Sequence, residues 1–110
     1  MSDLIKPAVW PPKWQPERIC AEFDFAPDMR AGDSIADNGI QFVITCVEGE
    51  DQAAAGIAYG APQRRGARVL QLLDGGVADC AYLVQCRVTT EQGQVLVLAG
   101  VLRVKALVAT

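Results

Sequence analysis

The sequence contains no histidine, few aromatic residues and no long hydrophobic run. Without histidine it lacks the commonest general base and a common metal ligand. No segment approaches the roughly 18 apolar residues that a membrane-spanning helix requires. The N-terminus, MSDLIKPAVW, has neither the basic start nor the long apolar stretch of a signal peptide, so we expect synthesis in a cytoplasm, where thiols stay reduced.

Motifs of the common enzyme classes are also missing, with no glycine-rich phosphate loop and no serine nucleophile motif. The acids Glu48, Glu50 and Asp51 fall in an expected loop without a base or an apolar pocket, which favours a solvated turn over catalysis. The acidic stretch DMRAGDSIADN has no calcium-loop spacing. The sequence therefore predicts a protein that is not an enzyme and has no cofactor and no metal site.

The four cysteines are spaced too widely for a typical zinc module, which takes its ligands in close pairs. Cys46 and Cys86 both fall on the inward faces of expected strands. They are either two packed thiols or the partners of a disulfide across a β-sandwich, and the frequent burial of free cysteine favours packed thiols.

The formal net charge of −3 argues against a nucleic-acid partner, because phosphate binding needs clustered Lys and Arg. Its distribution is uneven: eight acids and one base lie between Glu22 and Asp51, and Arg64, Arg65 and Arg68 follow. This pattern fits a solvated acidic face and a basic loop. It also fits self-complementary charge between neighbouring copies in an assembly.

Residues 1–18 differ from the rest of the chain, since KPAVWPPKWQP holds four prolines and both tryptophans. Proline fixes φ and removes an amide donor, so we expect an extended N-terminal arm. The tryptophans should dock, either over the domain's own sheet or in a groove of a neighbouring subunit. The candidate partner-binding residues are Trp10, Pro11, Pro12, Trp14, Arg64 and Arg65.

From residue 19 the hydrophobic period is close to two, which predicts β-strands. Ile19, Ala21, Phe23 and Phe25 share one face of the first strand. Further strands are expected at 40–48, 56–59, 68–73, 82–90 and 95–107, with an irregular loop through residue 66 and a tight turn at EQGQ. About six or seven strands predict an all-β fold, a single β-sandwich over residues 19–110.

Two stretches carry a family resemblance. The first, FDFAPDMRAGDSIADNGIQFVI, has an aspartate–aromatic pair at 24–25 and Gly-Asp-Ser-Ile at 32–35. The second has Gly75-Gly76, then Tyr82, alternating valines, a Thr-Thr pair at 89–90 and a Gly hairpin. Over residues 19–106 this order resembles the fiber-tail adaptor proteins of tailed bacteriophages, a family of small immunoglobulin-like proteins. The residues expected to define the fold are Asp24, Phe25, Gly32, Asp33, Gly75, Gly76, Tyr82, Cys86 and Gly93.

The resemblance implies an immunoglobulin-like sandwich that serves as a structural virion component, made in the bacterial host cytoplasm. It would be an adaptor that joins tail or collar to fibers or spikes through protein–protein contacts. A symmetric homo-oligomeric ring is expected, with no nucleic acid and no membrane as partner. Two alternatives remain open: a capsid decoration or head–tail connector subunit, and a carbohydrate- or ligand-binding module with Tyr59 as its exposed aromatic platform.

Overall fold

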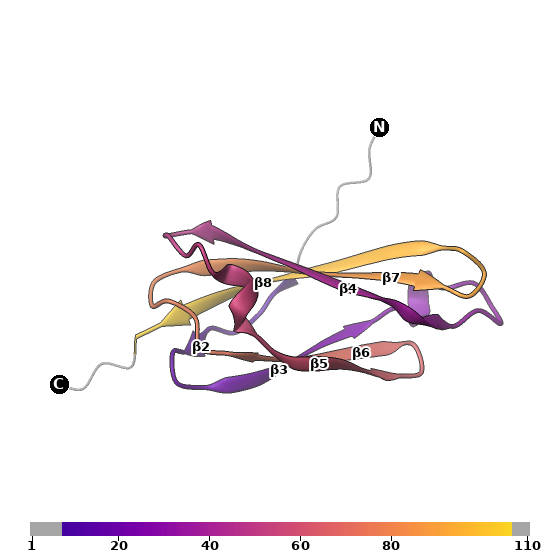
Figure 1. The fold of residues 1–110 in the computed structure, drawn as a ribbon, viewed down its shortest axis with the longest axis horizontal. Helices are drawn as coiled ribbons and strands as arrows, with labels where there is room; N and C mark the ends of the chain where they lie inside the picture. The colour runs from indigo at the N-terminus through magenta and orange to yellow at the C-terminus, as the bar shows by residue number, and fades with distance from the viewer. Residues whose placement is uncertain (1–7, 107–110) are drawn as a thin grey trace.

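The computed structural model describes residues 8–106, and these residues form two β-sheets that lie face to face (Figure 1). The strands are β1 (Ala8–Val9), β2 (Lys13–Trp14), β3 (Arg18–Asp24), β4 (Ile35–Glu48), β5 (Ala58–Arg65), β6 (Arg68–Asp74), β7 (Ala81–Thr90) and β8 (Val95–Lys105). Two short 3-10 helices, η1 (Ala26–Asp28) and η2 (Ala54–Ile57), lie in the connections. The all-β prediction is confirmed.

The two sheets have different sizes. The larger sheet has the order β1-β8-β7-β4, with β2 also paired to β8, and the smaller sheet has the order β3-β6-β5. Strands β3 to β8 pair antiparallel within their sheets, whereas β1 and β2 run parallel to β8. Within residues 8–106 no helix has the length and apolar character needed to cross a bilayer.

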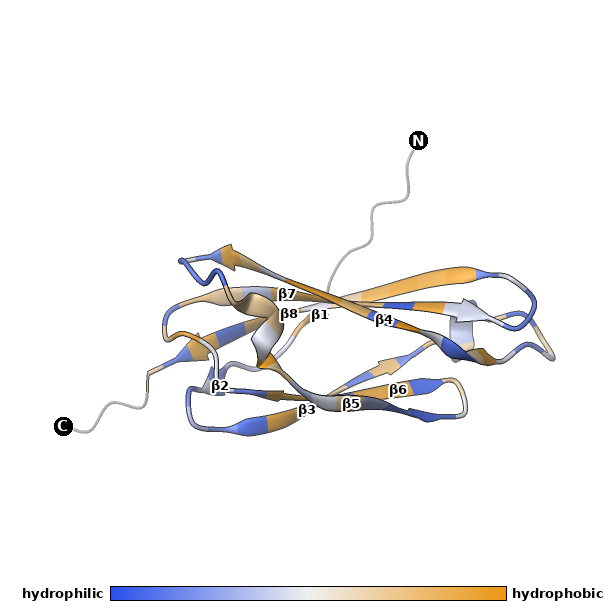
Figure 2. Ribbon diagram, viewed as in Figure 1, coloured by the Kyte–Doolittle hydropathy of each residue, from blue (hydrophilic) through white to orange (hydrophobic). Residues whose placement is uncertain are grey.

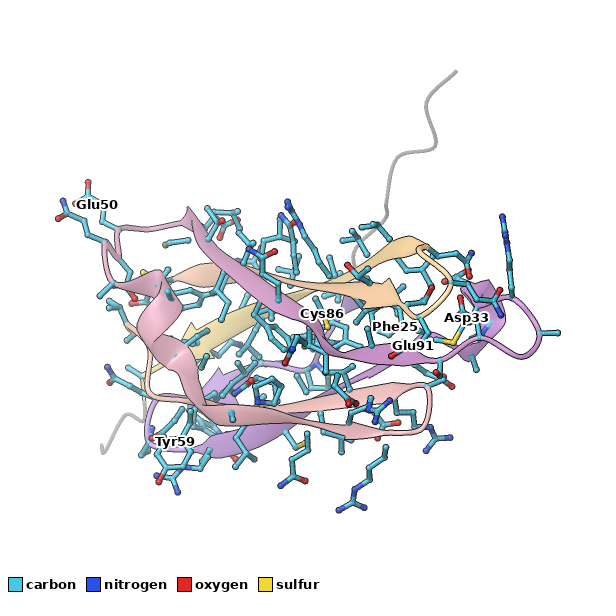
Figure 3. The ribbon with its side chains drawn as sticks, turned by 45° about the vertical axis from the view of Figure 1, so that its right-hand side comes forward. Phe25, Asp33, Glu50, Tyr59, Cys86 and Glu91 are labelled. Carbon is cyan, nitrogen blue, oxygen red and sulfur yellow. The ribbon has the colours of Figure 1, made fainter. Side chains whose placement is uncertain are left out.

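The core lies between the sheets and is built from alternate residues of each strand. On β7 the buried side chains include Tyr82, Val84, Cys86 and Val88, as the alternation predicts. Figure 3 shows Phe25 and Cys86 between the layers. Phe23 contacts Phe42 of the opposite sheet edge to face, with ring centroids 5.8 Å apart. Each sheet therefore contributes one apolar face to a common core.

The prediction of an irregular loop through residue 66 is wrong in part, because most of that segment is strand β5. Residues 58–65 pair with β6 from Ala58 opposite Leu73 to Arg65 opposite Arg68. The register shifts between Tyr59 and Gln63, which is where the turn-forming residues of the sequence lie. A bulge accommodates glycine and proline at a sheet edge, so pairing with β6 prevails over local propensity.

The alternative of a disulfide between Cys46 and Cys86 is wrong. Their strands are neighbours in one sheet, β4 and β7, and do not face each other across the core. Cys46 lies opposite Tyr82 and Cys86 lies opposite Phe42, so the two thiols sit at different registers of the same ladder. Both are free cysteines.

Strand β3 begins at Arg18, which was expected to be the last residue of the arm, and the division into an arm and a domain stays a prediction. Residues 1–7 of the expected arm and residues 107–110 of the expected domain lie outside the described residues. The described part of the arm, from Ala8 onward, lies along β8 in the larger sheet.

We predict that the pH dependence of stability changes when Cys86 is replaced by alanine. Burial raises the pKa of the Cys86 thiol to about 12 from the ordinary 9.0. The unfolded chain then ionises first, and the wild type loses stability relative to Cys86→Ala by about 1.4 kcal/mol per pH unit between pH 9 and 12. Urea unfolding at several pH values measures this. A constant difference between the two proteins over that range would contradict a buried thiol.

Candidate protein interface

The N-terminal arm continues the larger sheet by short parallel bridges to β8. Ala8 pairs with Gly100, and Lys13 pairs with Val104. Between the bridges the Trp10 amide donates to the Val101 carbonyl at 3.1 Å. Prolines at 11 and 12 lack this donor, which explains why the pairing is interrupted there. The arm is thus an edge element that docks on its own sheet, one of the two arrangements expected for it.

Trp10 links the arm to the core. Its ring packs edge to face on Phe23 of the smaller sheet, with centroids 5.6 Å apart. On its other side the indole lies against Gly100, where any Cβ would collide with the ring. Glycine at this position of β8 therefore admits the tryptophan, and Trp10 closes one side of the core.

Lys13 fixes the arm at its second bridge. Its side chain is only 1% exposed, and the ammonium donates to the carbonyls of Trp14, Gln15 and Gly75 at 3.0, 2.9 and 2.7 Å. Burial lowers the pKa of Lys13, and the carboxylates of Asp74 and Glu17 oppose that shift. All three N–H donors are used, as a buried ammonium requires.

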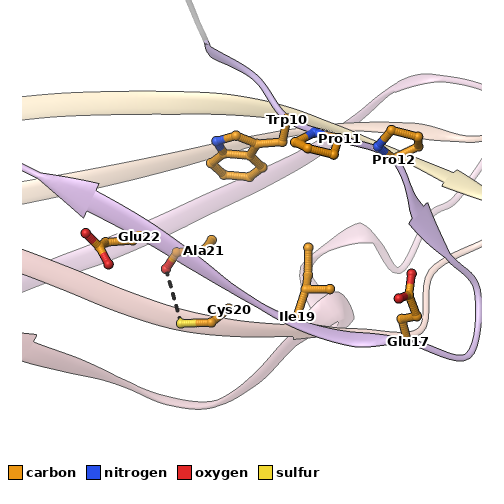
Figure 4. A pocket seen from close by; sticks show the side chains of 8 residues that line it. All are labelled: Trp10, Pro11, Pro12, Glu17, Ile19, Cys20, Ala21 and Glu22. Carbon is orange, nitrogen blue, oxygen red and sulfur yellow. Dashed lines mark hydrogen bonds between the residues drawn. The ribbon is translucent and has the colours of Figure 1, made fainter.

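A groove runs between the arm and strand β3 (Figure 4). Trp10, Pro11 and Pro12 form one wall, and the other wall is formed by the β3 edge from Ile19 to Glu22, with Glu17 at one end. Its volume is about 430 Å³. The predicted partner-binding residues of the arm are thus brought together beside a sheet edge, with Trp14 nearby and 46% exposed.

Strand β8 gives the outer face of the larger sheet an apolar stripe, beside which β7 places Gln85 opposite Ala99 and Arg87 opposite Val97. Four successive outward-facing side chains of strand β8, from alternate residues, lie on this face, and all four are aliphatic. Figure 2 shows hydrophobic colour along the first half of this strand. We call this surface the valine face, and its members are Val9, Val43, Leu83, Val95, Val97, Ala99 and Val101. Val9 is 79% exposed and Val95 is 67% exposed.

Sequence reasoning did not identify the valine face, although the sequence contains a signal for it. The run VLVLAGV is apolar at both parities, whereas a strand with one solvated face alternates. Both faces of such a strand are expected to be covered. In the described residues only the inward face of β8 is covered, by Tyr82 and the other core side chains.

The arginines of the predicted basic loop are used in different ways. Arg64 donates to the Ile35 carbonyl at 2.7 Å and pairs with Asp37 at 3.2 Å. Arg68 lies 3.6 Å from Glu22, and Arg65 is exposed. Acidic and basic segments therefore meet within one chain, an arrangement that neither interpretation of the charge pattern anticipated.

Tyr59 is exposed and points away from the two sheets (Figure 3), as the ligand-platform alternative requires. The guanidinium of Arg18 lies 3.7 Å from its ring centroid, in a cation–π contact. One face of the ring is therefore covered by the chain itself. In the described residues there is also no cluster of three or more side chains suited to hold a metal ion.

The segment with the first resemblance motif binds the β7–β8 hairpin. The Asp33 carboxylate accepts the amides of Ser34 at 2.8 Å and Gln92 at 3.0 Å. Desolvation opposes ionisation of Asp33, but the nearby Thr90 side chain and the two amides hold its pKa below the usual value. Asp24 caps the next turn by accepting the Ala26 amide at 3.0 Å.

The second motif surrounds Tyr82. Its hydroxyl donates to the Asp51 carboxylate at 2.6 Å and accepts the Val77 amide at 2.8 Å. A Cβ on Gly76, at φ +94°, would lie 3.0 Å from Val104, so this turn favours glycine. The four glycines expected to define the fold have positive φ: Gly32, Gly75, Gly76 and Gly93.

Comparison with known proteins gives one result. A model of the family described as "Podophage GP4 fiber-tail adaptor protein gp77" matches residues 13–103, which is most of the chain. A search of curated proteins returned no match. The family match covers strands β3 to β7 and nearly all of β8, and it begins at Lys13 of the arm.

We predict that Trp10 stabilises the isolated chain and that Trp14 does not. Trp10→Ala should lower the free energy of unfolding by about 2 kcal/mol or more, because it leaves a cavity against Phe23. The exposed Trp14→Ala is the control and should change it by less than about 1 kcal/mol. Denaturant unfolding of each variant measures the effect.

Gly100→Ala gives an independent check, because its methyl group would displace the Trp10 ring while leaving the tryptophan present. It should destabilise the chain about as much as Trp10→Ala. Wild-type stability for both variants would mean that the arm does not dock on its own sheet, and would favour a neighbouring subunit as its site.

Proposed function

Because the chain belongs to the podophage fiber-tail adaptor family, we propose that it is the virion protein that joins the fibers of a phage particle to its tail. The family match over residues 13–103 carries this conclusion. The chain supplies a structural body with surfaces for other virion proteins. An adaptor of this kind needs two separate contact surfaces, and the valine face and the groove beside β3 are the two candidates.

The body of this adaptor is proposed to be an immunoglobulin-like sandwich with the arm as an added element. The strand order supports this: β3, β6 and β5 correspond to strands B, E and D, while β4, β7 and β8 correspond to C, F and G. The arm takes a place beside β8, in the sheet of strand G. Rigid sandwiches of this type hold their exposed surfaces in fixed positions.

The valine face is proposed as the contact with the tail. A permanent contact between structural components buries an apolar surface, because such interfaces resemble a domain core that has been cut in half. The outward aliphatic side chains of β8 and the exposed Val9 next to them provide that surface. Several copies are proposed to be arranged in a symmetric ring, since structural subunits of a tail follow its symmetry.

We predict that Val97→Glu blocks binding to the tail while the chain stays folded. A carboxylate on the valine face would be desolvated in the contact, which should weaken binding about tenfold or more. The matched control is Leu72→Glu, a half-exposed position on the outer face of the other sheet. Co-sedimentation with tails that lack the adaptor measures binding, and circular dichroism checks the fold. Equal binding of the two variants would contradict a tail contact through this face.

The copy number and position of the chain in purified particles test the adaptor role itself. Cryo-electron microscopy with quantitative mass spectrometry should find about six to a dozen copies at the tail, in keeping with a symmetric ring. Hundreds of copies over the head would instead indicate capsid decoration. Absence from the particles would contradict a structural role.

A further inference from the structure

The groove between the arm and β3 has the features of a site for an added β-strand. We propose that it binds an extended segment of the fiber protein, which adds to the free edge of β3 as a further strand of the smaller sheet. This proposal rests on the adaptor function above and names how one of the two partners is held. The argument begins with the backbone of β3.

The hydrogen-bond pattern shows which backbone groups of β3 face the groove. The Phe25 amide donates to Ala67, so Phe25 is a hydrogen-bonded residue of the antiparallel ladder with β6. Hydrogen-bonded positions alternate along such a ladder. Phe23, Ala21 and Ile19 therefore bond to β6, while the N–H and C=O groups of Cys20 and Glu22 point to the other side. In the described part of the chain, no hydrogen bond to these groups is present.

The other free edges of the two sheets are less suited to accept a strand. The register of β5 is broken between Tyr59 and Gln63, and Pro62 lies in that break. The register of β4 shifts near both of its ends. Strand β3 keeps an unbroken register with β6 over all seven residues. Bulges and proline are common protection against unwanted pairing at sheet edges, and β3 has neither.

The opposite wall explains why the arm leaves the β3 edge unpaired and what fits between them. Pro11 and Pro12 have no amide to offer to β3, so the arm faces this edge without pairing with it. The arm is held there by β8 and Lys13, and Trp10 and the two prolines give the wall an apolar surface. Figure 4 shows these rings on one side of the groove and Ile19 to Glu22 on the other.

These walls also select one class of occupant. A gap bounded by both sheets of one sandwich admits a single extended chain, whereas the edge of a second folded copy would bring two sheets with it. The lining contains two carboxylates and no basic residue: Glu17, which accepts the Trp14 amide at 2.7 Å, and the exposed Glu22, which lies 3.6 Å from Arg68. Main-chain bonds provide affinity in strand addition, and alternate side chains provide specificity. The expected segment spans about four residues along β3, with apolar side chains toward Trp10 and a lysine or arginine near Glu22.

The test uses the full chain, the purified fiber protein of the same particle, and synthetic peptides that tile the fiber sequence. One peptide should bind, and its binding should slow hydrogen exchange of the Cys20 and Glu22 amides, measured by NMR, by about tenfold or more. Cys20→Pro removes an outward amide without removing a bond to β6, and should weaken peptide binding by about tenfold or more. Leu72→Glu, outside the groove, is the control and should keep wild-type affinity.

A second variant tests the groove without introducing a proline into β3. Glu22→Lys should weaken the basic peptide, and a peptide in which the basic residue is replaced by glutamate should recover binding to this variant. Such reciprocal rescue requires the two side chains to be neighbours and does not follow from a general loss of stability.

The outcomes separate the groove from the adaptor function. If the fiber protein binds but the Cys20 and Glu22 amides exchange freely and both variants bind normally, strand addition is wrong and the adaptor function stands. If a tail peptide, or a second copy of the chain, protects these amides and the fiber does not, the fiber assignment is overturned. If neither tail nor fiber binds the wild type, the adaptor function fails and the groove proposal fails with it.

Discussion

The buried ammonium of Lys13 is the constraint on which both candidate surfaces depend. A charge with 1% exposure needs every donor satisfied, and the carbonyls that satisfy it belong to the arm itself and to the turn at Gly75. The bond to Gly75 ties the arm to the turn after β6, and the backbone bridge from Lys13 to Val104 holds it along β8, away from β3. If the arm paired with β3 instead, the groove would be filled by the chain's own residues. The position of one lysine therefore determines which sheet edge stays open, and Gln15 strengthens the same contact by donating to the Gly76 carbonyl at 3.1 Å.

The arm contributes to both surfaces because its side chains alternate. Val9 lies opposite Val101 and extends the valine face, whereas Trp10, the next residue, forms a wall of the groove and contacts Phe23. A partner that contacts Val9 on the valine face therefore lies next to Trp10, which forms a wall of the groove. Any rotation of the arm about β8 would alter both, and Gly100, with no room for a side chain under Trp10, limits such movement.

Local alternation was enough to predict the core strands, because burial of one face depends mainly on near neighbours in sequence. The buried side chains of β7 and the exposed Arg103 beside buried Leu102 follow directly from it. Most of strand β5, beyond the strand expected at 56–59, was missed because its pairing with β6 is a tertiary interaction that overrides Gly60 and Pro62. The disulfide alternative for Cys46 and Cys86 failed for a similar reason, since periodicity gives the face of a residue but not which strands are neighbours. The arm residues were singled out as partner-binding from their proline and tryptophan content, and this stays a prediction. The groove beside them also needs β3, which no local signal indicates.

The charges of the molecule bear on how it recognises partners. Four arginines, at positions 18, 64, 68 and 103, form ion pairs with acids of the same chain. Exposed pairs of this kind contribute about 0–1 kcal/mol each, so their main effect is to neutralise the surface. A surface neutralised in this way offers little long-range attraction to a charged partner. Recognition then depends on short-range contacts, namely the aliphatic side chains of β8 and the unpaired backbone groups of β3. Both kinds of contact require a rigid scaffold, because flat apolar faces and strand edges discriminate only when their geometry is fixed, and the two packed sheets provide that rigidity.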